Sequence, residues 1–379
     1  MDLNNIRTDI SNIDEQMVNL IVRRMQLVLE VAKYKQENHL PVLDKSRERD
    51  ILNRVTGIGE EGFEEYLKTL FSVLFDMSRS YQIRVLTPEG PLTDKIERAV
   101  RETPLMFPPK AVVACQGVEG AYSQMACDKM FSLPNIIYCR HFEGVFQAVE
   151  SGLCQYGILP IENSSWGSVR AVYDLMKEYR FYIVRSAKLC LSHTLLTRER
   201  VKLSDIHEIV SHEQALAQCS EFLKQNPQIK ISVCENTAVA AKMIAESPRN
   251  DIAAISSKNC AELYGLKILS DSIQNNANNY TRFICISKNL EIYPGSNKIS
   301  LMLSLPHRPG ALYSTIARFA ALGLNLTKLE SRPIPGRDFE FMFYFDMDAS
   351  VYSKELLKLL SKFEQGTDPF VFLGCYTEI

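Results

Sequence analysis

Residues 3–37 read "LNNIRTDISNIDEQMVNLIVRRMQLVLEVAKYKQE", a run without glycine or proline that predicts one long helix. Seven apolar side chains fall on a single stripe roughly 80° wide: Ile6, Ile10, Ile13, Met17, Leu20, Val28 and Val31. At 1.5 Å per residue the helix would be about 50 Å long. One short helical domain cannot cover that length, so we expect a second chain to cover part of it.

Two cations, Arg24 and Lys35, fall on the same apolar stripe. A cation on an apolar face is costly unless it is paired. Each side chain alone could extend past the edge of the core into water. Two cations that face one way inside one stripe favour an anionic ligand.

The segment Gly57–Gly62 ("GIGEEG") has the spacing of a dinucleotide-binding loop. Such a loop must follow a strand and begin a helix within a βαβ unit. Here the preceding "RERDILNRVT" is charged and helical, and Glu60 and Glu61 would lie where a pyrophosphate should bind. We therefore interpret the segment as a turn between two helices and exclude an NAD site.

Composition narrows the classes of partner and compartment. The formal net charge of -2 argues against nucleic-acid and anionic-membrane partners. No apolar run is long enough to span a bilayer, and the first residues lack the layout of a signal peptide. The ten cysteines and six histidines show no metal-ligand spacing. We expect a cytoplasmic protein without a metal site.

Two proline-rich breaks, 86–110 and 290–298, divide the chain. Residues 1–88 are predicted to be all-helical. Residues 109–288 alternate apolar runs with amphipathic helices, which predicts an α/β domain. Residues 297–379 follow the order β-α-β-β-α-β, which predicts an α+β ferredoxin-like domain.

Two further helices are predicted in the first domain. Pro41 is expected to begin "PVLDKSRERDILNRV", whose spacing places Asp44, Arg47 and Glu48 on one face. The third helix, "FEEYLKTLFSVLFDMSRSYQIRVL", places Ser78 and Gln82 one turn apart.

This helical segment resembles the all-helical chorismate mutase family. The resemblance implies a site formed by Arg7, Arg24, Lys35, Asp44, Arg47, Glu48, Ser78 and Gln82. The reaction is one pericyclic step that needs no cofactor, so the protein has only to clamp a dianion and stabilise developing charge. Arginines suit the two carboxylates of chorismate. Lys35 and Gln82 would donate to the ether oxygen, Asp44 and Glu48 would hold the hydroxyl, and Arg47 and Ser78 would complete the carboxylate contacts.

Arg7 lies about 26 Å along the helix from Arg24 and roughly 100° around it. One small molecule cannot reach both from the same chain. If both act, Arg7 comes from a partner, as the intertwined dimer of this family implies. The expected assembly is a homodimer or a higher homo-oligomer.

Small polar residues gather at four junctions of the middle domain, where helix N-termini offer free N–H groups to carboxylates. Residue chemistry alone leaves open an enzyme or a solute-binding protein. The segments "PIENSSWGSV", "SHEQALAQC", "NTAVAA" and "NNYTRF" resemble prephenate dehydratase. That family has a two-lobed fold like the periplasmic binding proteins.

By this resemblance, Thr281 assists the departure of hydroxide while the ring carboxylate leaves as carbon dioxide. A threonine hydroxyl is a weak acid and must be positioned by its neighbours. The polar candidates are Glu162, Asn163, Ser164 and Gln214. Arg282 is a candidate carboxylate anchor, although neighbouring strand residues point to opposite faces.

The segment "RPGALYSTIARFAALGLNLTKLESRP" resembles the ACT regulatory domain that accompanies this dehydratase. The resemblance implies L-phenylalanine binding by Gly310, Ala311, Leu312, Asn325, Glu330, Ser331, Arg332 and Pro333. A purely structural ferredoxin-like module would explain the fold, but it would not explain the presence of both Gly310–Leu312 and Glu330–Pro333.

Taken in order, the three segments resemble the bifunctional chorismate mutase/prephenate dehydratase family over nearly the whole chain. The implied reactions convert chorismate to prephenate and then to phenylpyruvate, with feedback inhibition by L-phenylalanine. The alternatives are a dehydratase that uses arogenate and a non-catalytic amino-acid sensor. The sequence leaves open the substrate preference and the relative rates of the two reactions. It also leaves open whether prephenate passes directly between the sites and whether the oligomer is a dimer or a tetramer.

Overall fold

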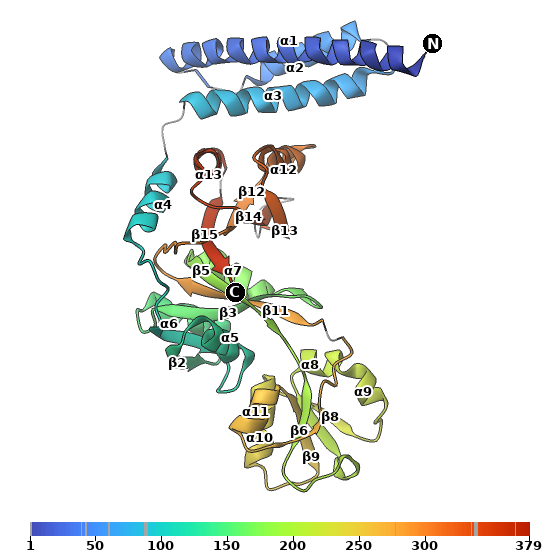
Figure 1. Cartoon of the computed structure of the whole chain (residues 1–379), viewed down its shortest axis with the longest axis vertical. Helices are drawn as coiled ribbons and strands as arrows, with labels where there is room; N and C mark the ends of the chain where they lie inside the picture. The colour runs from blue at the N-terminus through green and yellow to red at the C-terminus, as the bar shows by residue number, and fades with distance from the viewer. Residues whose placement is uncertain are drawn as a thin grey trace.

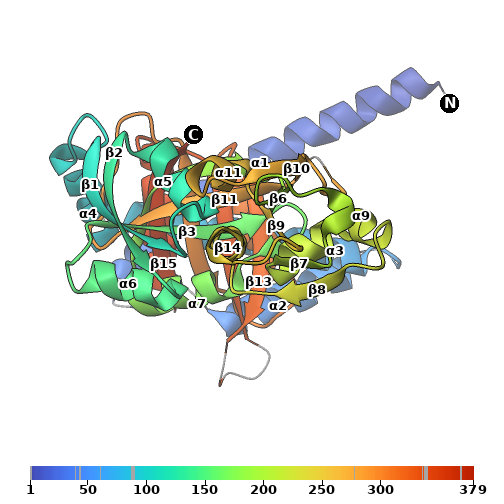
Figure 2. The same ribbon diagram turned by 90° about the horizontal axis from the view of Figure 1, so that it is seen from below.

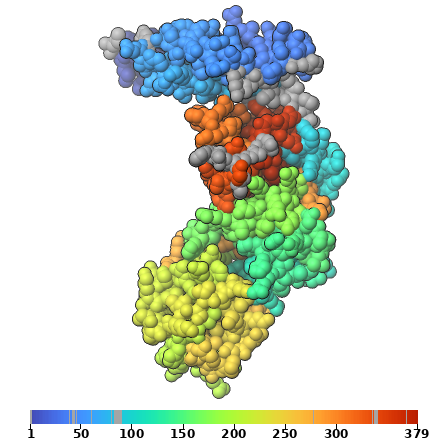
Figure 3. All heavy atoms as spheres, turned by 180° about the vertical axis from the view of Figure 1, so that it is seen from behind, coloured from blue at the N-terminus to red at the C-terminus, as the bar shows by residue number. Residues whose placement is uncertain are grey.

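The computed structural model of the chain describes residues 2–38, 40–41, 44–59, 61–86, 90–276, 278–334, 336, 340–367 and 369–379. Four bodies follow one another along the long axis: the N-terminal helices, the C-terminal domain and the two lobes of the middle domain (Figures 1 and 3). The C-terminal domain therefore lies between two domains that precede it in the sequence.

Three helices form the N-terminal domain: α1 (Leu3–Glu37), α2 (Lys45–Ile58) and α3 (Glu64–Leu86). Both α1 and α2 pack against α3, while the N-terminal part of α1 extends beyond the rest of the chain (Figure 2). Ile10 and Leu20 of the apolar stripe are 52% and 65% exposed. One chain thus leaves much of the stripe uncovered.

The second helix begins at Lys45 and not at Pro41, which corrects the predicted start. Asp44 is its N-cap, because the Asp44 carboxylate accepts a 3.0 Å hydrogen bond from the backbone N–H of Arg47. Asp44 therefore precedes the helix. Residues 42–43 lie outside the described residues.

In the glycine-rich segment, Gly57 and Ile58 end α2 and residues 61–62 form a turn before α3, as predicted, while Glu60 lies outside the described residues. Gly59 is the C-cap of α2. The first strand of the described chain, β1, begins only at Lys110. The strand that a dinucleotide loop requires does not precede this segment in the described residues.

A short helix, α4 (Pro91–Glu102), lies in the predicted break between the first two domains. Its buried residues Leu92, Ile96 and Ala99 join the core of the C-terminal domain. The hydroxyls of Thr93 and Ser361 are 2.6 Å apart. The break is therefore partly built into the C-terminal domain.

The first lobe of the middle domain is a sheet of order β5-β11-β3-β1-β2, with the short β4 paired to β3. Its strands are β1 (Lys110–Gln116), β2 (Leu133–Cys139), β3 (Tyr156–Asn163), β4 (Gly167–Ser168), β5 (Tyr182–Cys190) and β11 (Tyr280–Ser287). Its helices are α5 (Tyr122–Met130), α6 (Phe142–Glu150) and α7 (Arg170–Tyr179).

The second lobe is a sheet of order β10-β6-β9-β7-β8. Its strands are β6 (Thr194–Thr197), β7 (Glu208–Ser211), β8 (Lys230–Val233), β9 (Ile252–Ser256) and β10 (Lys267–Ser270). Its helices are η1 (Leu203–Asp205), α8 (Glu213–Gln218), α9 (Ser220–Lys224), α10 (Thr237–Glu246) and α11 (Lys258–Leu263). The chain passes between the lobes after β5 and before β11, which gives the predicted two-lobed domain.

The C-terminal domain has the predicted β-α-β-β-α-β order, with sheet order β13-β14-β12-β15. Its elements are β12 (Lys298–Ser304), α12 (Ala311–Ala321), β13 (Asn325–Pro333), β14 (Phe341–Asp348), α13 (Lys354–Gly366) and β15 (Phe370–Glu378).

The C-terminal sheet continues into the first lobe of the middle domain, because β15 pairs in parallel with β5. Gly374 on β15 has φ +141°, and a Cβ atom there would lie 2.3 Å from the carbonyl oxygen of Ile183. Only glycine fits so close an approach. Met302, Met342 and Leu373 share one buried core with residues of the first lobe, so the two bodies pack as one unit.

Candidate active sites

Thr281 lies at the start of β11, in register with Asn163 on β3, and is only 5% exposed. The Asn163 side-chain amide donates a 2.8 Å hydrogen bond to the Thr281 hydroxyl oxygen. The Asn163 carbonyl oxygen accepts hydrogen bonds from the backbone N–H groups of Ser165 and Trp166, at 2.9 and 3.0 Å. This fixes which end of the amide faces Thr281. Since Thr281 accepts from Asn163, its own hydrogen remains available for donation.

A chain of hydrogen bonds continues from Asn163 towards the second lobe. Asn163 also donates to the side-chain oxygen of Asn279 at 2.9 Å, and Asn279 donates to Gln218 at 3.0 Å. The Gln218 oxygen lies 2.6 Å from Nε2 of His193. These side chains belong to β3, α8 and both segments that connect the lobes, so the network crosses the junction between the lobes.

His193 is buried, and burial lowers the pKa of its imidazole. Because the Gln218 oxygen accepts from Asn279, it also accepts from His193, which places the proton of a neutral imidazole on Nε2. Nδ1 of His193 lies 3.4 Å from the hydroxyl of Tyr122. His193 thus supports the network as a neutral group.

Three residues of this network were missed by the sequence analysis. Gln218 and Asn279 lie inside the segments "SHEQALAQC" and "NNYTRF". The motifs therefore contain both residues, but no local pattern distinguishes them from their neighbours. His193 lies outside all of the quoted segments, and its role follows only from the tertiary contact with Gln218.

Two other predicted residues lie near the network but outside it. The Ser164 hydroxyl donates to the backbone oxygen of Asn278 at 3.1 Å and accepts from the backbone N–H of Tyr280 at 3.0 Å. It therefore holds the segment that leads into Thr281. Gln214 is exposed in the first turn of α8, where its backbone N–H donates to the imidazole of His212 at 3.2 Å.

Arg282 and Glu162 face away from Thr281. Both belong to one register pair of β11 and β3, and their side chains are 3.3 Å apart. Arg282 also forms a buried ion pair with Asp346 on β14. Burial lowers the pKa of the Arg282 guanidinium, but attraction to the charges around it, Asp346 above all, outweighs burial and raises that pKa overall. The structure therefore does not bring Arg282 together with Thr281. It places Arg282 in the interface with the C-terminal domain.

Half-buried ion pairs continue this cluster along one face of β13. Lys328 lies 3.2 Å from Glu162 and donates to the Ser168 hydroxyl at 2.7 Å. Arg332 pairs with Glu330 at 2.9 Å, and Glu330 accepts a hydrogen bond from Ser168. Burial raises the pKa of the Glu330 carboxyl, but its contacts with Ser168, Arg332 and Lys328 outweigh burial and lower that pKa overall. The cluster joins β13 and β14 to the strands that carry Asn163 and Thr281.

Side-chain alternation divides the predicted regulatory residues between two faces of the sheet. Glu330 and Arg332 face the middle domain, whereas Ser331 and Pro333 alternate with them and are exposed. Gly310 is the N-cap of α12 with φ +79°. The remaining members are Ala311, which is buried, Leu312, which is half-buried, and Asn325, which donates to Asp348 at 2.9 Å.

In the helical domain, Arg24 of α1 contacts Ser78 of α3, and Gln82 lies one turn further along α3. The half-buried Arg24 donates to the Ser78 hydroxyl, and Ser78 donates to the backbone oxygen of Leu74. Gln82 is 7% exposed, and its amide oxygen has no hydrogen-bond partner among the described residues. An unpaired buried polar atom costs about 1–3 kcal/mol, which fits a site for a polar ligand.

The other predicted residues of this domain are less closely gathered. Glu48 pairs with Arg79 of α3, and Lys35 is half-buried on α1. Asp44 caps α2, and the Arg47 side chain is exposed. Arg7 is exposed near the N-terminal end of α1. One chain alone therefore brings together only part of the predicted set.

Among the described helices, none combines the length and the apolar character that crossing a bilayer requires.

The helical domain and the two-lobed domain each match a known protein family. The family model of chorismate mutase type II matches residues 6–83, and that of prephenate dehydratase matches residues 113–291. A curated relative from Arabidopsis thaliana, a chloroplastic arogenate dehydratase/prephenate dehydratase 2, is 38% identical over 70% of this chain and 72% of its own length. A solved prephenate dehydratase from Arthrobacter aurescens, in complex with L-Phe, superposes with a TM-score of 0.64 at 28% identity, and covers 70% of this chain and 89% of that one.

A further relative spans both parts. The bifunctional chorismate mutase/prephenate dehydratase of Escherichia coli (strain K12) is 32% identical over 98% of this chain and 95% of its own length. With the helical domain and the two-lobed domain in the same order, this chain belongs to the bifunctional chorismate mutase/prephenate dehydratase family.

Proposed function

We propose that the chain catalyses two consecutive reactions of phenylalanine biosynthesis in the cytoplasm. Its helical domain rearranges chorismate to prephenate, and its two-lobed domain converts prephenate to phenylpyruvate. The observation that carries the second activity is the Thr281 hydroxyl, held by Asn163 with its hydrogen available. Neither reaction requires a cofactor.

In the dehydratase step, the Thr281 hydroxyl donates a hydrogen bond to the departing ring hydroxyl. The C–O bond breaks with its electron pair on oxygen, and the C–C bond to the ring carboxylate supplies the pair that completes the aromatic ring. The products are carbon dioxide, phenylpyruvate and a hydroxide that takes up a proton from solvent. Thr281 stabilises the charge on the leaving oxygen. Asn163 holds the Thr281 hydroxyl in place, and Asn279 in turn accepts a hydrogen bond from Asn163.

In the mutase step, Arg24 and its hydrogen-bonded Ser78 bind one carboxylate of chorismate. Lys35 and Gln82 stabilise the negative charge that develops on the ether oxygen. Asp44, Arg47 and Glu48 contact the rest of the substrate. Arg7 is supplied by a second copy of the chain, which also covers the exposed apolar stripe of α1.

The C-terminal domain is an ACT regulatory domain in this proposal, with L-phenylalanine as effector. Gly310–Leu312 at the start of α12 and the exposed face of β13 with Ser331 and Pro333 would hold the ligand. Asn325 is the first residue of the same strand. Glu330 and Arg332 instead connect this strand to the middle domain. Effector binding is thus coupled to the strands of Asn163 and Thr281.

An arogenate-using dehydratase is the second candidate, because a relative named for both substrates is 38% identical over 70% of this chain. Arogenate differs from prephenate in carrying an amino group where prephenate has a keto group. Purified chain should be incubated with chorismate, with prephenate and with arogenate, and the products separated. Phenylpyruvate from chorismate supports the proposal, whereas phenylalanine formed only from arogenate would replace it with the second candidate.

A further inference from the structure

Arg79 is a cation of α3 whose two terminal nitrogens contact two different carboxylates. Its Nη1 pairs with Glu48 of α2, and its Nη2 pairs with Asp76, three residues earlier on α3. The Arg79 side chain is only 15% exposed, and those of Glu48 and Asp76 are 25% and 22% exposed. Ion pairs that are partly shielded from water attract each other more strongly than pairs at an open surface. Arg79 thus holds α2 against α3 at the position of Glu48.

The neighbours of Arg79 on α3 belong to the proposed mutase site. Ser78 precedes it and accepts a hydrogen bond from Arg24 of α1, and Gln82 follows it by three residues. Consecutive helix residues are about 100° apart, so Ser78 faces α1 while Arg79 reaches α2. One turn of α3 therefore contacts both other helices of the domain. No local pattern selects Arg79, because its partner Glu48 lies 31 positions away.

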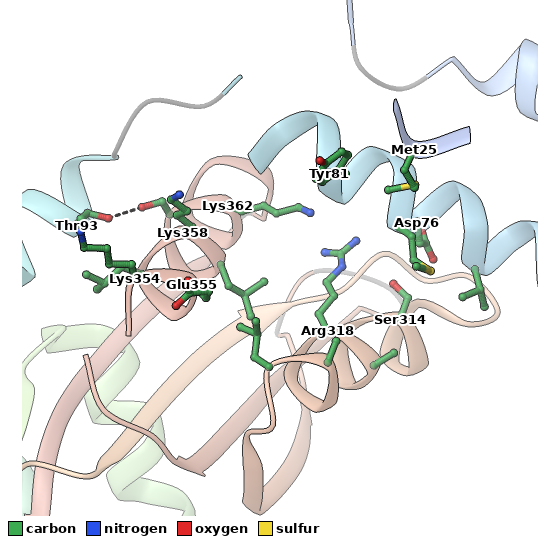
Figure 4. A pocket seen from close by; sticks show the side chains of 18 of the residues that line it. Met25, Asp76, Tyr81, Thr93, Ser314, Arg318, Lys354, Glu355, Lys358 and Lys362 are labelled. Carbon is green, nitrogen blue, oxygen red and sulfur yellow. Dashed lines mark hydrogen bonds between the residues drawn. The ribbon is translucent and has the colours of Figure 1, made fainter. Parts of the chain in front are cut away.

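Asp76 connects the same guanidinium to the side of α3 that faces the C-terminal domain. It lines a cavity of about 560 Å³ whose walls come mainly from α3, α12 and α13. Figure 4 shows Asp76 on α3 and Arg318 of α12 directed towards this helix. Asp76 therefore lies at the interface between the two domains. Of the two carboxylates that Arg79 contacts, only that of Glu48 belongs to the predicted mutase residues.

We propose that Arg79 is a positioning residue of the mutase reaction and acts through Glu48. This inference rests on the proposed mutase function, in which Glu48 contacts the hydroxyl of chorismate. Arg79 occupies one oxygen of the Glu48 carboxylate, and the other oxygen is able to accept from the substrate hydroxyl. In the described part of the chain, no other group donates a hydrogen bond to this carboxylate. Without Arg79, the Glu48 side chain would regain rotamer freedom and leave this position.

Arg79 also offsets negative charge beside an anionic substrate. Chorismate carries two carboxylates, so the carboxylate of Glu48 alone would repel it. The Arg79 guanidinium contacts both Glu48 and Asp76 and compensates part of their combined charge. Arginine suits this position, because its planar fork presents two nitrogens to two carboxylates, whereas lysine offers a single point charge. Arg79 thus allows a carboxylate to bind a hydroxyl group next to a dianion.

The test measures KM and kcat for chorismate in purified full-length chains. Arg79→Met should raise KM by about 10- to 100-fold, because a misplacement of about 1 Å costs up to about 10²-fold. The value of kcat should change by less than about threefold, since the substrate hydroxyl is held before and during the rearrangement alike. Arg79→Lys keeps the charge without the fork and should raise KM less, by about three- to tenfold.

Lys68→Met is the matched control. Lys68 lies on the same helix and forms an exposed pair with Glu65, three residues earlier, as Arg79 does with Asp76. Its replacement should leave both KM and kcat for chorismate unchanged. Far-UV circular dichroism reports the helix content of every variant, and Arg79→Lys carries the test if Arg79→Met loses helix.

A double-mutant cycle with Glu48→Gln separates an indirect role of Arg79 from a direct one. If Arg79 acts through Glu48, Arg79→Met should change KM by less than about threefold in the Glu48→Gln chain. The same rise of KM in both backgrounds would show that Arg79 contacts the substrate itself. A purely structural pair would reduce the amount of active enzyme and lower the apparent kcat at unchanged KM. Either of these two results would overturn the proposal.

The parent chain distinguishes this inference from the function on which it rests. A parent chain that turns over supplied prephenate but not chorismate would overturn the proposed mutase function, and the role of Arg79 with it. A parent chain with mutase activity whose KM is the same in Arg79→Met would overturn the role of Arg79 alone.

Discussion

At the scale of single residues, the proposed dehydratase reaction depends on Thr281 as a hydrogen-bond donor, since Asn163 donates to its oxygen and leaves its own hydrogen available. Thr281→Ala removes the donor, and loss of one such donor typically lowers kcat by about 10²- to 10³-fold. Thr281→Ser keeps the hydroxyl and should retain far more activity. Turnover of supplied prephenate measures the effect, and turnover of chorismate to prephenate should stay unchanged in both variants. A folded Thr281→Ala chain that lost both activities would contradict two separate sites.

The neutral state of His193 predicts a pH dependence of stability. Its folded-state pKa is lowered by burial, so the unfolded chain takes up the proton first as pH falls below about 6.5. The stability that neutral His193 contributes above that pH is therefore lost as pH falls through the folded-state pKa. His193→Gln cannot titrate and should lose less stability between pH 7.5 and pH 5.5. Urea midpoints followed by fluorescence of Trp166, the single tryptophan, compare the two chains.

At the scale of elements, the alternation of side chains along a strand allowed the sequence to predict which neighbouring residues face in opposite directions. It placed Thr281 and Arg282 on opposite faces of one strand, and the structure shows Thr281 beside Asn163 and Arg282 beside Asp346. The pairing with Asp346 brings together residues 64 positions apart, and no local pattern reports such a contact. The same holds for the contact of His193 with Gln218. Propensity also misplaced the start of α2, because the capping hydrogen bond of Asp44 decides it.

The buried pair of Arg282 and Asp346 should couple the C-terminal sheet to the catalytic strands. Arg282→Met leaves Asp346 buried without its cation and should destabilise the chain by about 3–5 kcal/mol. The double change Arg282→Met/Asp346→Leu removes both charges and should recover much of that loss. Inhibition by L-phenylalanine should weaken in the double variant, since one link between β14 and β11 is gone. As a control, Lys68→Met breaks an exposed pair with Glu65 and should cost less than about 1 kcal/mol.

The backbone of Gly310 gives a second test of regulation. Its φ of +79° is strained for a β-branched residue, although a Cβ atom would meet no neighbour within 4 Å. Gly310→Val should therefore distort the start of α12 and relieve inhibition by L-phenylalanine while sparing activity at saturating prephenate. Gly310→Asn, which tolerates this conformation better, should stay closer to the parent chain. Equal inhibition of the parent and Gly310→Val would place the effector elsewhere.

At the scale of the whole molecule, the exposed stripe of α1 implies that the mutase site is completed by a second chain. Arg24 donates a hydrogen bond to Ser78 within one chain, whereas Arg7 lies near the N-terminal end of the same helix. In a symmetric dimer, each site would then combine Arg24 of one copy with Arg7 of the other. Arg7→Ala and Arg24→Ala should each abolish the mutase activity when assayed alone.

Mixing those two inactive chains by co-refolding tests the shared site directly. A heterodimer has one site that lacks both arginines and one site that contains both. Random pairing makes half of the dimers mixed, so about a quarter of the parent mutase activity should return. Mixing Arg24→Ala with Lys35→Ala is the control. These two side chains share one stripe of α1, so each site of that heterodimer lacks one of them and no activity should return. Demonstrated Arg7→Ala/Arg24→Ala heterodimers without activity would show that Arg7 does not act across the interface.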